Sequence, residues 1–310
     1  MVRGRVTVNE PLKPLTTIRI GGPADLMAAP ADEDDLLAAL AWARQHQVPW
    51  HILGAGSNLL VPDEGLRGLV VRTRPALDTL RFDGNRVLVG SGASVARLVG
   101  QAARLGLQGV EGLAGVPGSV GGALAMNAGT RGGDIGSRVE WVRIVDQEGR
   151  VRELTREELA FGYRSSRLQQ EPWLALTACL VLEPGDPQAI RARVDDALRY
   201  RNETQPLQWP NAGSIFKNPP GDAAGRLIDA AGCKGMRRGD AQVSEMHANW
   251  IINLGDARAD DVVALMVDVA EAVWSRFALV LEPEIRLLGP LSARWRQAVA
   301  RLEQQPGSPA

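Results

Sequence analysis

The stretch Gly115-Val-Pro-Gly-Ser-Val-Gly-Gly-Ala-Leu-Ala-Met-Asn-Ala-Gly129 says most about the fold of this chain. It places five glycines, one proline and one serine around a short apolar run. Because glycine has no Cβ, it adopts positive φ and lets another molecule lie directly against the main chain. Backbone N–H groups in such turns form a concave anion site, and a helix that starts just after them adds its positive end. The stretch therefore predicts a site for a diphosphate.

A second glycine turn, Gly54-Ala-Gly-Ser-Asn58, follows the apolar run Trp50–Leu53, which reads as a strand. Two turns of this kind predict one extended dinucleotide that is held at two points. Neither turn has the common dinucleotide fingerprint G-x-G-x-x-G. In the Gly54 turn the third glycine would fall at Leu59, and Gly118-Ser-Val-Gly121 lacks the paired G-x-G. Simple tight turns between packed elements are the alternative, and that alternative is stronger for the Gly54 turn.

Composition describes a globular protein of two or three domains. The chain has 310 residues, of which 45% are hydrophobic and 23% charged. A formal net charge of −1 gives no electrostatic case for binding nucleic acid or a membrane surface. No leader-like apolar segment follows the start, and no apolar run is long enough to span a bilayer, so a cytoplasmic location is expected.

The cysteines and histidines predict neither a disulfide framework nor a metal site. Cys179 and Cys233 lie far apart in the sequence and form no zinc-binding pattern. His46, His51 and His247 do not make a plausible set of metal ligands. We therefore expect no bound metal ion.

Periodicity predicts helices and strands in alternation, hence an α+β chain. Helices are expected over residues 32–47, 94–105, 188–203, 222–231 and 260–277. Strands are expected over residues 50–53, 69–71, 86–90, 139–145, 150–154, 174–182, 249–253 and 280–288. The best candidate linker is Pro184-Gly-Asp-Pro187, and the residues after Pro290 suggest a surface helix with a mobile tail.

Three polar clusters could carry chemistry: Tyr163-Arg-Ser-Ser166, Asn211-Ala-Gly-Ser-Ile-Phe-Lys-Asn-Pro219 and Leu281-Glu-Pro-Glu-Ile-Arg286. Ser214 has no histidine near it in sequence and no G-x-S-x-G context, so a proton donor fits better than a nucleophile. If 280–288 is a strand, Glu282 and Glu284 point the same way, and one turned inward would be a buried acid.

Arg164 could clamp a planar carboxylate through its guanidinium fork. Each of these residues also has an ordinary explanation when taken alone. Ser214 would then be a turn serine, the glutamates would belong to a solvated strand face, and Arg164 would be a surface arginine.

Taken in order, the motifs resemble UDP-N-acetylenolpyruvoylglucosamine reductase. The resemblance runs from about Leu12 to Gly289, and the ordered set is far more specific than any single glycine motif. The motifs that carry it are Thr17-Ile-Arg-Ile-Gly-Gly22, Gly54-Ala-Gly-Ser-Asn58, Gly115–Gly129, Tyr163-Arg164, Gly213-Ser-Ile-Phe-Lys-Asn218 and Leu281-Glu-Pro-Glu284.

The resemblance implies an α+β fold. A two-subdomain FAD-binding region of the vanillyl-alcohol-oxidase-like type would be followed by a smaller α+β substrate-binding domain. The two FAD-binding subdomains would cover residues 1–74 and 75–186, and the substrate-binding domain residues 187–290. Residues 291–310 would form a C-terminal helix and a flexible tail.

The resemblance also implies an activity. NADPH would reduce a non-covalently bound FAD, and the enolpyruvyl group of UDP-N-acetylglucosamine enolpyruvate would then be reduced to give UDP-N-acetylmuramate for peptidoglycan. Arg164 would stabilise the negative charge that grows toward the carboxylate, Ser214 would protonate the adjacent carbon, and Glu284 would assist. Partners would be the sugar nucleotide and NADPH, with no nucleic acid and no membrane, and a monomer is favoured over an oligomer.

Two sets of binding residues follow from the resemblance. FAD would contact Gly54, Ala55, Gly56, Ser57, Asn58, Leu59, Gly115, Pro117, Gly118, Ser119, Gly121, Gly122, Ala123, Asn127, Ala128 and Gly129. Substrate would contact Tyr163, Arg164, Arg201, Lys217, Asn218, Gln242 and His247. The short spacing between Arg164 and Ser214 suggests a compact subtype without the tyrosine-bearing capping loop, whose task residues 200–206 could share.

Two other functions compete with this one. An FAD-linked oxidase of an alcohol or hydroxy acid would share the glycine turns, but it has no use for Gly213-Ser-Ile-Phe-Lys-Asn218. A nucleotide-binding regulator that has lost catalysis would have no need of Arg164, Ser214 and Glu284 together.

Overall fold

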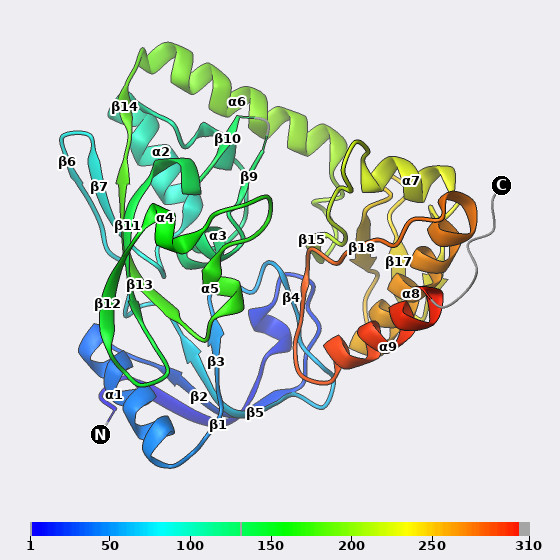
Figure 1. The fold of residues 1–310 in the computed structure, drawn as a ribbon, viewed down its shortest axis with the longest axis horizontal. Coiled ribbons are helices and arrows are strands. Elements are labelled where there is room, and N and C mark those ends of the chain that lie inside the picture. Colours follow the sequence, from blue (N-terminus) through cyan, green and yellow to red (C-terminus); the bar gives the residue numbers. More distant parts are fainter. Residues whose placement is uncertain (1, 131, 304–310) are drawn as a thin grey trace. The chain divides into compact units, whose positions relative to one another are not determined.

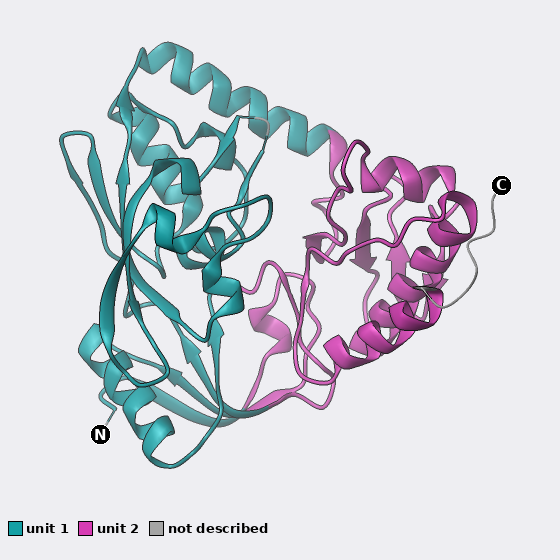
Figure 2. Cartoon of the chain, in the orientation of Figure 1, with its two compact units in different colours: residues 1–9, 25–55, 67–203 teal, residues 10–24, 56–66, 204–310 magenta. Residues whose placement is uncertain are grey.

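The computed structural model describes residues 2–130 and 132–303, and the chain divides into two compact units (Figure 2). The first unit comprises residues 1–9, 25–55 and 67–203, and the second comprises residues 10–24, 56–66 and 204–310. Both contain helices and strands, as the α+β prediction requires (Figure 1). The predicted domain boundaries at residues 74, 186 and 290 stay predictions, because a division by compactness does not test them.

A four-stranded sheet, formed mainly by residues of the first unit, has the order β1-β2-β5-β3. Its strands are β1 (Arg5–Pro11), β2 (Pro23–Ala29), β3 (Trp50–Leu53) and β5 (Leu66–Arg72). Strands β3 and β5 pair in parallel, with Trp50 opposite Leu69. Helix α1 (Glu33–Gln45) begins at the N-cap Asp32, whose carboxylate accepts a hydrogen bond from the Asp35 amide. The predicted helix and both predicted strands of this region are confirmed.

The second sheet of this unit is antiparallel and has the order β12-β11-β13-β7-β6. Its strands are β6 (Leu80–Asp83), β7 (Arg86–Gly90), β11 (Val139–Val145), β12 (Val151–Thr155) and β13 (Leu174–Val181). The predicted hairpin is the β11–β12 pair, in which Val145 lies opposite Val151. Its turn is closed by the Asp146 side chain, which accepts from the Arg150 amide at 2.9 Å.

Helices and short strands complete the first unit. The helices are α2 (Val95–Arg104), α3 (Val120–Ala125), α4 (Arg156–Leu159), α5 (Arg167–Gln170) and α6 (Pro187–Thr204). Two single-turn 3-10 helices, η2 (Glu111–Leu113) and η3 (Gly136–Arg138), lie between them. The short pairs are β8 (Leu107–Gln108) with β14 (Glu183–Pro184) and β9 (Gly129–Thr130) with β10 (Gly133–Asp134).

Two apolar clusters stabilise this unit. One joins Leu36 of α1 to Val71 of β5 and Leu176 of β13, so α1 packs on strands of both sheets. The other joins Leu98 of α2 and Leu124 of α3 to the face of the five-stranded sheet. Both helices therefore rest on buried leucines, and α3, which lies inside the glycine-rich stretch, fixes the middle of that stretch on the sheet.

The second unit is built on an antiparallel sheet of order β15-β18-β17-β16. Its strands are β15 (Asn211–Ser214), β16 (Arg237–Arg238), β17 (Ala241–Val243) and β18 (Trp250–Asn253). A parallel pair joins β4 (Leu59–Leu60) to β19 (Arg286–Leu287). The helices are η1 (Lys13–Leu15), α7 (Ala224–Ala230), α8 (Ala259–Phe277) and α9 (Leu291–Glu303).

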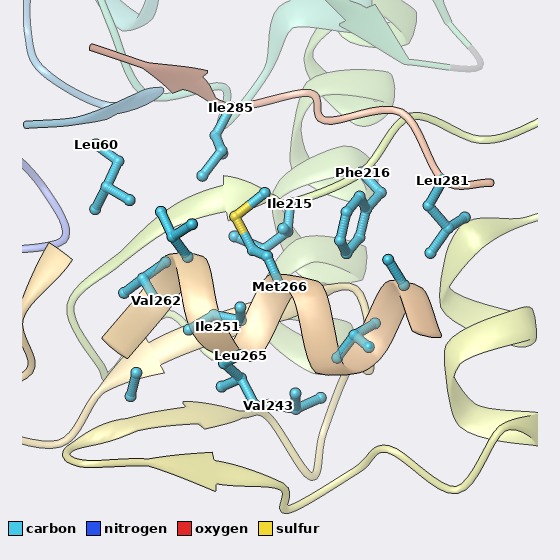
Figure 3. Packing of buried hydrophobic residues seen from close by; sticks show 14 of the residues in the cluster. Leu60, Ile215, Phe216, Val243, Ile251, Val262, Leu265, Met266, Leu281 and Ile285 are labelled. Atoms are coloured by element: carbon cyan, nitrogen blue, oxygen red, sulfur yellow. The ribbon is translucent and has the colours of Figure 1, made fainter. Parts of the chain in front are cut away.

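Helix α8 covers one face of this sheet. Val243 of β17 and Ile251 of β18 belong to the same buried cluster as Leu265 and Met266 of α8 (Figure 3). The Asp63 carboxylate accepts from the first amides of α8, at 3.0 Å and 3.4 Å, and so satisfies donors that have no partner within the helix. The predicted helix over residues 260–277 and the strand over residues 249–253 are confirmed within a residue or so at their ends.

The strand predicted over residues 280–288 is wrong for most of its length. Only Arg286–Leu287 forms a strand, and Pro283 makes a single isolated bridge to Phe216. The bonds at this bridge run from Lys217 N–H to Glu282 O at 2.8 Å and from Glu284 N–H to Ile215 O at 2.7 Å, so Pro283 occupies a position whose N–H the pairing does not use. Glu282 and Glu284 therefore flank a single bridge, and the regular strand on which they were expected to share a face is absent.

The prediction of a surface helix after Pro290 is confirmed, since Arg294, Arg296 and Arg301 are exposed and the opposite face is buried. Helix α9 packs against α8, and Leu291, Trp295 and Leu302 are buried in the cluster of the second unit. The predicted mobile tail, Pro306-Gly-Ser-Pro309, lies outside the described residues.

Neither a membrane-spanning helix nor a cluster of metal-binding side chains occurs among the described residues. None of the helices there is both long and apolar enough to cross a membrane. In that part of the chain no three His, Cys, Asp or Glu side chains are grouped so that they could hold a metal ion. Cys179 and Cys233 are both free and buried.

Candidate active site

The glycine-rich stretch contains a short helix that starts just after the turn at Gly118. Helix α3 starts at Val120, with Ser119 as its N-cap. Its first amides are already bonded: Val120 N–H donates to Ala93 O at 2.8 Å, Gly121 N–H to Ser91 O at 2.8 Å, and Gly122 N–H to Ser119 Oγ at 3.4 Å. These three amides are used inside the protein, so any diphosphate must use other amides of the two turns.

The two glycine turns approach each other within the first unit. A Cβ built at Gly54 would lie only 2.5 Å from Ser119 Oγ, and one built at Gly121 would lie 2.8 Å from Ser91 Cβ. Gly115 and Gly118 have φ of +74° and +139°, values that side chains rarely allow. The stretch thus presents bare main chain where no side chain fits, which suits a ligand that lies flat against the backbone.

Arg164 is held in a left-handed conformation, with φ of +51°. Its guanidinium donates to Gly129 O at 2.9 Å and lies over the Tyr163 ring, 5.4 Å from the ring centroid. A non-glycine residue in this region costs of order 1 kcal/mol, and such strain persists only where the surroundings impose it. The guanidinium therefore reaches the last residue of the glycine-rich stretch.

The loop that carries Arg164 is anchored on both sides. Asn127 Nδ2 donates to Gly162 O at 2.9 Å, while Asn127 Oδ1 accepts from the Gly136 amide at 2.9 Å. Ser166 is fully buried and donates to Ala125 O at 2.8 Å, and Gln169 Nε2 donates to the same oxygen at 2.7 Å. The Asn127 side chain, predicted to bind cofactor, thus serves to position the arginine loop.

Arg201, on helix α6, is the other predicted site residue that contacts the glycine-rich stretch. A Cβ at Gly115 would lie 2.7 Å from Arg201 Cδ, so the arginine stem packs directly on the main chain there. Burial lowers the pKa of Arg201 from its ordinary value, which reflects the cost of holding that cation away from water.

In the second unit, the latter half of the Gly54 turn is tied to the predicted catalytic glutamate. Gly56 has φ of +66°, and its carbonyl accepts from the Thr17 amide at 3.1 Å. Asn58 Nδ2 donates to Glu284 O at 3.1 Å, and Asn58 O accepts from the Arg286 amide at 3.0 Å. Asn58 therefore acts through its side chain and main chain to fix the Glu284 segment.

Ser214 owes its orientation to a bulge in strand β15. Asn211 lies opposite Ile252 and Ser214 opposite Trp250, so three steps along β15 match two along β18. The extra residue lies in the register shift that contains Gly213, whose φ is +80°. Without it, a residue three positions after Asn211 would point to the opposite face.

The bulge places Ser214 on the sheet face that α8 does not cover. Ala212 and Ile251 face the buried cluster with α8. Gln242, a predicted substrate contact, lies opposite Ile252 in the ladder and therefore shares the face of Ser214.

Ser214 and Glu284, far apart in sequence, are brought into neighbouring segments. The Glu284 amide donates to Ile215 O at 2.7 Å. One residue on, Asn249 Oδ1 accepts from the Phe216 amide at 2.9 Å and Asn249 Nδ2 donates to Phe216 O at 2.8 Å. Sequence reasoning missed Asn249 as a site residue, although an amide at the start of an apolar predicted strand was a usable signal.

The remaining predicted substrate residues of this unit have mixed positions. Lys217 forms an ion pair with Glu282, whose side chain is 70% exposed. Asn218 Oδ1 accepts from the Ala224 amide at 3.0 Å, at the start of α7. His247 Nδ1 accepts from the Asn249 amide at 3.2 Å, and burial together with the Lys234 charge lowers the pKa of the imidazole. His247 is thus structurally engaged, and its lowered pKa favours the neutral imidazole.

The structure therefore groups the predicted residues into two sets. Within the first unit lie Gly54 and Ala55, the stretch from Gly115 to Gly129, and Tyr163, Arg164 and Arg201. Within the second lie Gly56, Ser57, Asn58 and Leu59, with Lys217, Asn218, Gln242 and His247, and the pair Ser214 and Glu284. The chain passes from one unit to the other inside the Gly54 turn itself.

Comparison with known proteins identifies the family. Residues 24–155 match the FAD binding domain family, and residues 205–288 match the C-terminal domain of UDP-N-acetylenolpyruvoylglucosamine reductase. The chain is 48% identical to UDP-N-acetylenolpyruvoylglucosamine reductase 2 of Symbiobacterium thermophilum, over 92% of this chain and 93% of that protein. The chain belongs to the UDP-N-acetylenolpyruvoylglucosamine reductase family.

Other members of the reductase family are similar to this chain over most of its length. The Heliobacterium modesticaldum reductase is 46% identical over 93% of this chain and 92% of its own length. A crystal structure of the reductase from Thermus caldophilus superimposes with a TM-score of 0.79 at 39% identity, covering 93% of this chain and all of that one. The predicted resemblance is confirmed, and so is the prediction of an α+β FAD-dependent oxidoreductase.

The residues present fit FAD. The FAD-binding match spans both glycine turns, and their bare main chain is the kind of surface on which a dinucleotide can lie. The C-terminal match spans Leu281 to Glu284 and also Gly213 to Asn218, the motif for which an alcohol or hydroxy acid oxidase has no use. The reductase family thus accounts for both halves of the chain.

Proposed function

We propose that this protein uses NADPH and FAD to reduce the enolpyruvyl group of UDP-N-acetylglucosamine enolpyruvate, which yields UDP-N-acetylmuramate for peptidoglycan synthesis. The observation that carries the proposal is the reductase relationship over 92% of the chain, with Arg164, Ser214 and Glu284 at the motif positions. Bound FAD supplies the hydride chemistry, and the chain supplies position and electrostatic field.

FAD would be held by the two glycine turns. Support comes from the approach of Gly54 to Ser119 and from the positive φ of Gly115 and Gly118. The remaining proposed contacts are Ala55, Gly56, Ser57, Asn58, Leu59, Pro117, Gly121, Gly122, Ala123, Asn127, Ala128 and Gly129. For Asn58 and Asn127 the main chain is the proposed contact, because their side chains already bond Glu284 O and Gly162 O.

Arg164 would stabilise the negative charge that develops on the substrate carboxylate. A guanidinium fork matches two carboxylate oxygens, and the bond to Gly129 O pre-orients it so that little reorganisation is needed during reaction. Removal of one such donor usually costs a factor of about 100 to 1,000 in kcat.

Ser214 would donate a proton to the carbon next to the carboxylate, and Glu284 would support that transfer by a hydrogen bond. A hydroxyl is a weak acid, so a neighbouring group must assist it. The bond from the Glu284 amide to Ile215 O supports this pairing, because it fixes the two segments side by side.

The substrate would bind to Tyr163, Arg164, Arg201, Lys217, Asn218, Gln242 and His247, with residues 187–290 as its principal domain. Gln242 has the strongest structural support, since it shares a sheet face with Ser214. Residues 200–206 would share the covering role of the missing tyrosine loop. A cytoplasmic monomer is proposed, because NADPH and UDP-sugars are cytoplasmic metabolites and the motifs for one complete reaction lie in one chain.

A Ser214→Ala variant tests the function. The flavin of this variant should bleach with NADPH at the wild-type rate, because that step needs no proton from Ser214. Its recolouring by the enolpyruvyl sugar nucleotide should slow by a factor of about 100 or more. The control is wild-type protein, which should recolour with this substrate and not with simple alcohols. Normal recolouring of the variant would refute the role of Ser214, and a wild-type flavin that ignores the substrate would refute the function.

A further inference from the structure

Helix α9 lies beyond the segment that matches the reductase C-terminal domain, which ends at residue 288. It nevertheless packs on α8, and Leu291, Trp295 and Leu302 are buried in the same apolar cluster as the sheet and α8. An ion pair between Arg294 and Asp260 adds a second link to α8. Because packed interiors transmit displacements, a change in α9 can shift the buried side chains that it contacts.

The contact that matters is the one between Trp295 and Phe216. Their ring centroids are 5.7 Å apart at an interplanar angle of 46°, which is within the range of favourable aromatic pairs. Phe216 is among the largest fully buried side chains of the protein, and Trp295 is 7% exposed. The Phe216 ring lies in the packed layer above α8, close to Ile215 and Leu281 (Figure 3).

Phe216 links the two proposed catalytic segments of this unit. It follows Ser214 by two residues, and it forms an isolated bridge to Pro283, the residue before Glu284. Its main chain is fixed by both polar atoms of the Asn249 side chain. The Phe216 main chain is therefore held beside both the Ser214 and the Glu284 segments.

We propose that Trp295 is a positioning residue for the substrate-reducing step, acting through Phe216 to hold Ser214 and Glu284 in register. The inference rests on the proposed function of those two residues. Trp295 itself touches no reacting atom. Its indole fills the space against which the Phe216 ring rests, because packed interiors leave little room for a ring to settle elsewhere without moving its main chain.

The proposal predicts a selective loss. Trp295→Ala leaves a space beside Phe216, and a displacement of about 1 Å at a proton donor can slow a reaction by as much as a factor of about 100. Recolouring of the reduced flavin by substrate should slow by at least about tenfold. Bleaching by NADPH should stay within about twofold of wild type, because that step uses neither Ser214 nor Glu284.

Two variants separate positioning from general stability. Leu302→Ala removes another buried side chain of α9 from the same cluster, so it lowers the melting temperature without removing the Phe216 contact. Trp295→Phe keeps an aromatic ring at the contact and should restore most of the recolouring rate. All rates are measured well below each variant's melting temperature, on holoenzyme loaded with FAD.

The expected result is slow recolouring in Trp295→Ala, near-normal recolouring in Trp295→Phe and Leu302→Ala, and normal bleaching in all three. Equal slowing in Leu302→Ala, or a normal rate in Trp295→Ala, would overturn the proposal. If Trp295→Ala does not fold, Trp295→Leu takes its place, and a wild-type rate in that variant would overturn it equally. A wild-type protein that does not reduce the substrate would instead contradict the proposed function.

Discussion

The approach of the two glycine turns gives a sharp test through the pair Gly54 and Ser119. The φ of Gly54 is not in the left-handed region, so its backbone accepts alanine. The obstacle is local: the new Cβ would lie 2.5 Å from Ser119 Oγ, whereas Ser119 Cβ would be 3.5 Å away. A Gly54→Ala substitution must therefore displace one hydroxyl and little else.

The size of the effect follows from what that hydroxyl does. Ser119 Oγ caps α3 by accepting from the Gly122 amide at 3.4 Å, and loss of such a cap costs about 0.5 to 1 kcal/mol. Replacement of glycine by alanine at a compatible site gains about 0.4 to 1 kcal/mol by restricting the unfolded chain. When Gly54→Ala is made in wild type, the lost cap and the restriction of the unfolded chain offset each other, so the free energy of unfolding should change little. In a Ser119→Ala background the cap is already lost, so Gly54→Ala should be stabilising by about 0.4 to 1 kcal/mol.

The assay is a double-mutant cycle. Free energies of unfolding are measured in urea for wild type, both single variants and the double variant, with the flavin removed so that changes in FAD affinity do not enter. We expect a coupling energy of about 0.5 to 1 kcal/mol, with the double variant more stable than Ser119→Ala. Additive effects within about 0.3 kcal/mol, or a double variant less stable than either single one, would refute the proximity of the turns.

Two further predictions concern buried polar groups. Burial alone would raise the pKa of the Glu111 carboxyl, but hydrogen bonds from Arg193 and the Gly109 amide hold that pKa below its ordinary value of 4.5. The ionised Glu111 carboxylate thus contributes stability that is complete above pH 4.5 and is lost as the pH falls through the lowered pKa. The difference in melting temperature between wild type and Glu111→Gln should therefore narrow below pH 4.5. A difference that stays constant with pH would contradict this. Asn249→Ala leaves the buried N–H and C=O of Phe216 without partners and should lower the free energy of unfolding in urea by about 3 kcal/mol. A decrease of less than about 1 kcal/mol would mean that other groups replace the Asn249 amide.

Much of the local structure could be read from the sequence. The helix over residues 260–277 and the hairpin over residues 139–154 show the expected periodicity and turn residues, and the structure has both. The glycine turns can be predicted because glycine adopts positive φ readily whatever its surroundings. Gly115, Gly118 and Gly56 all have positive φ in the structure. The strand predicted over residues 280–288 is wrong because the neighbouring segment pairs with it at one bridge only, and an alternating pattern does not show how long a partner the fold supplies.

The sequence by itself determined which chemical groups are available: flexible main chain at the glycine turns, a hydroxyl at Ser214, a guanidinium at Arg164 and a carboxyl at Glu284. Only the tertiary structure decided how they are supported. The bulge at Gly213 selects the face of Ser214, Asn249 and Asn58 fix the segments of Ser214 and Glu284, and α9 reaches their shared support through Trp295. Such contacts join residues far apart in the chain, and they depend on close packing and on the pairing of buried polar groups, which no local pattern encodes.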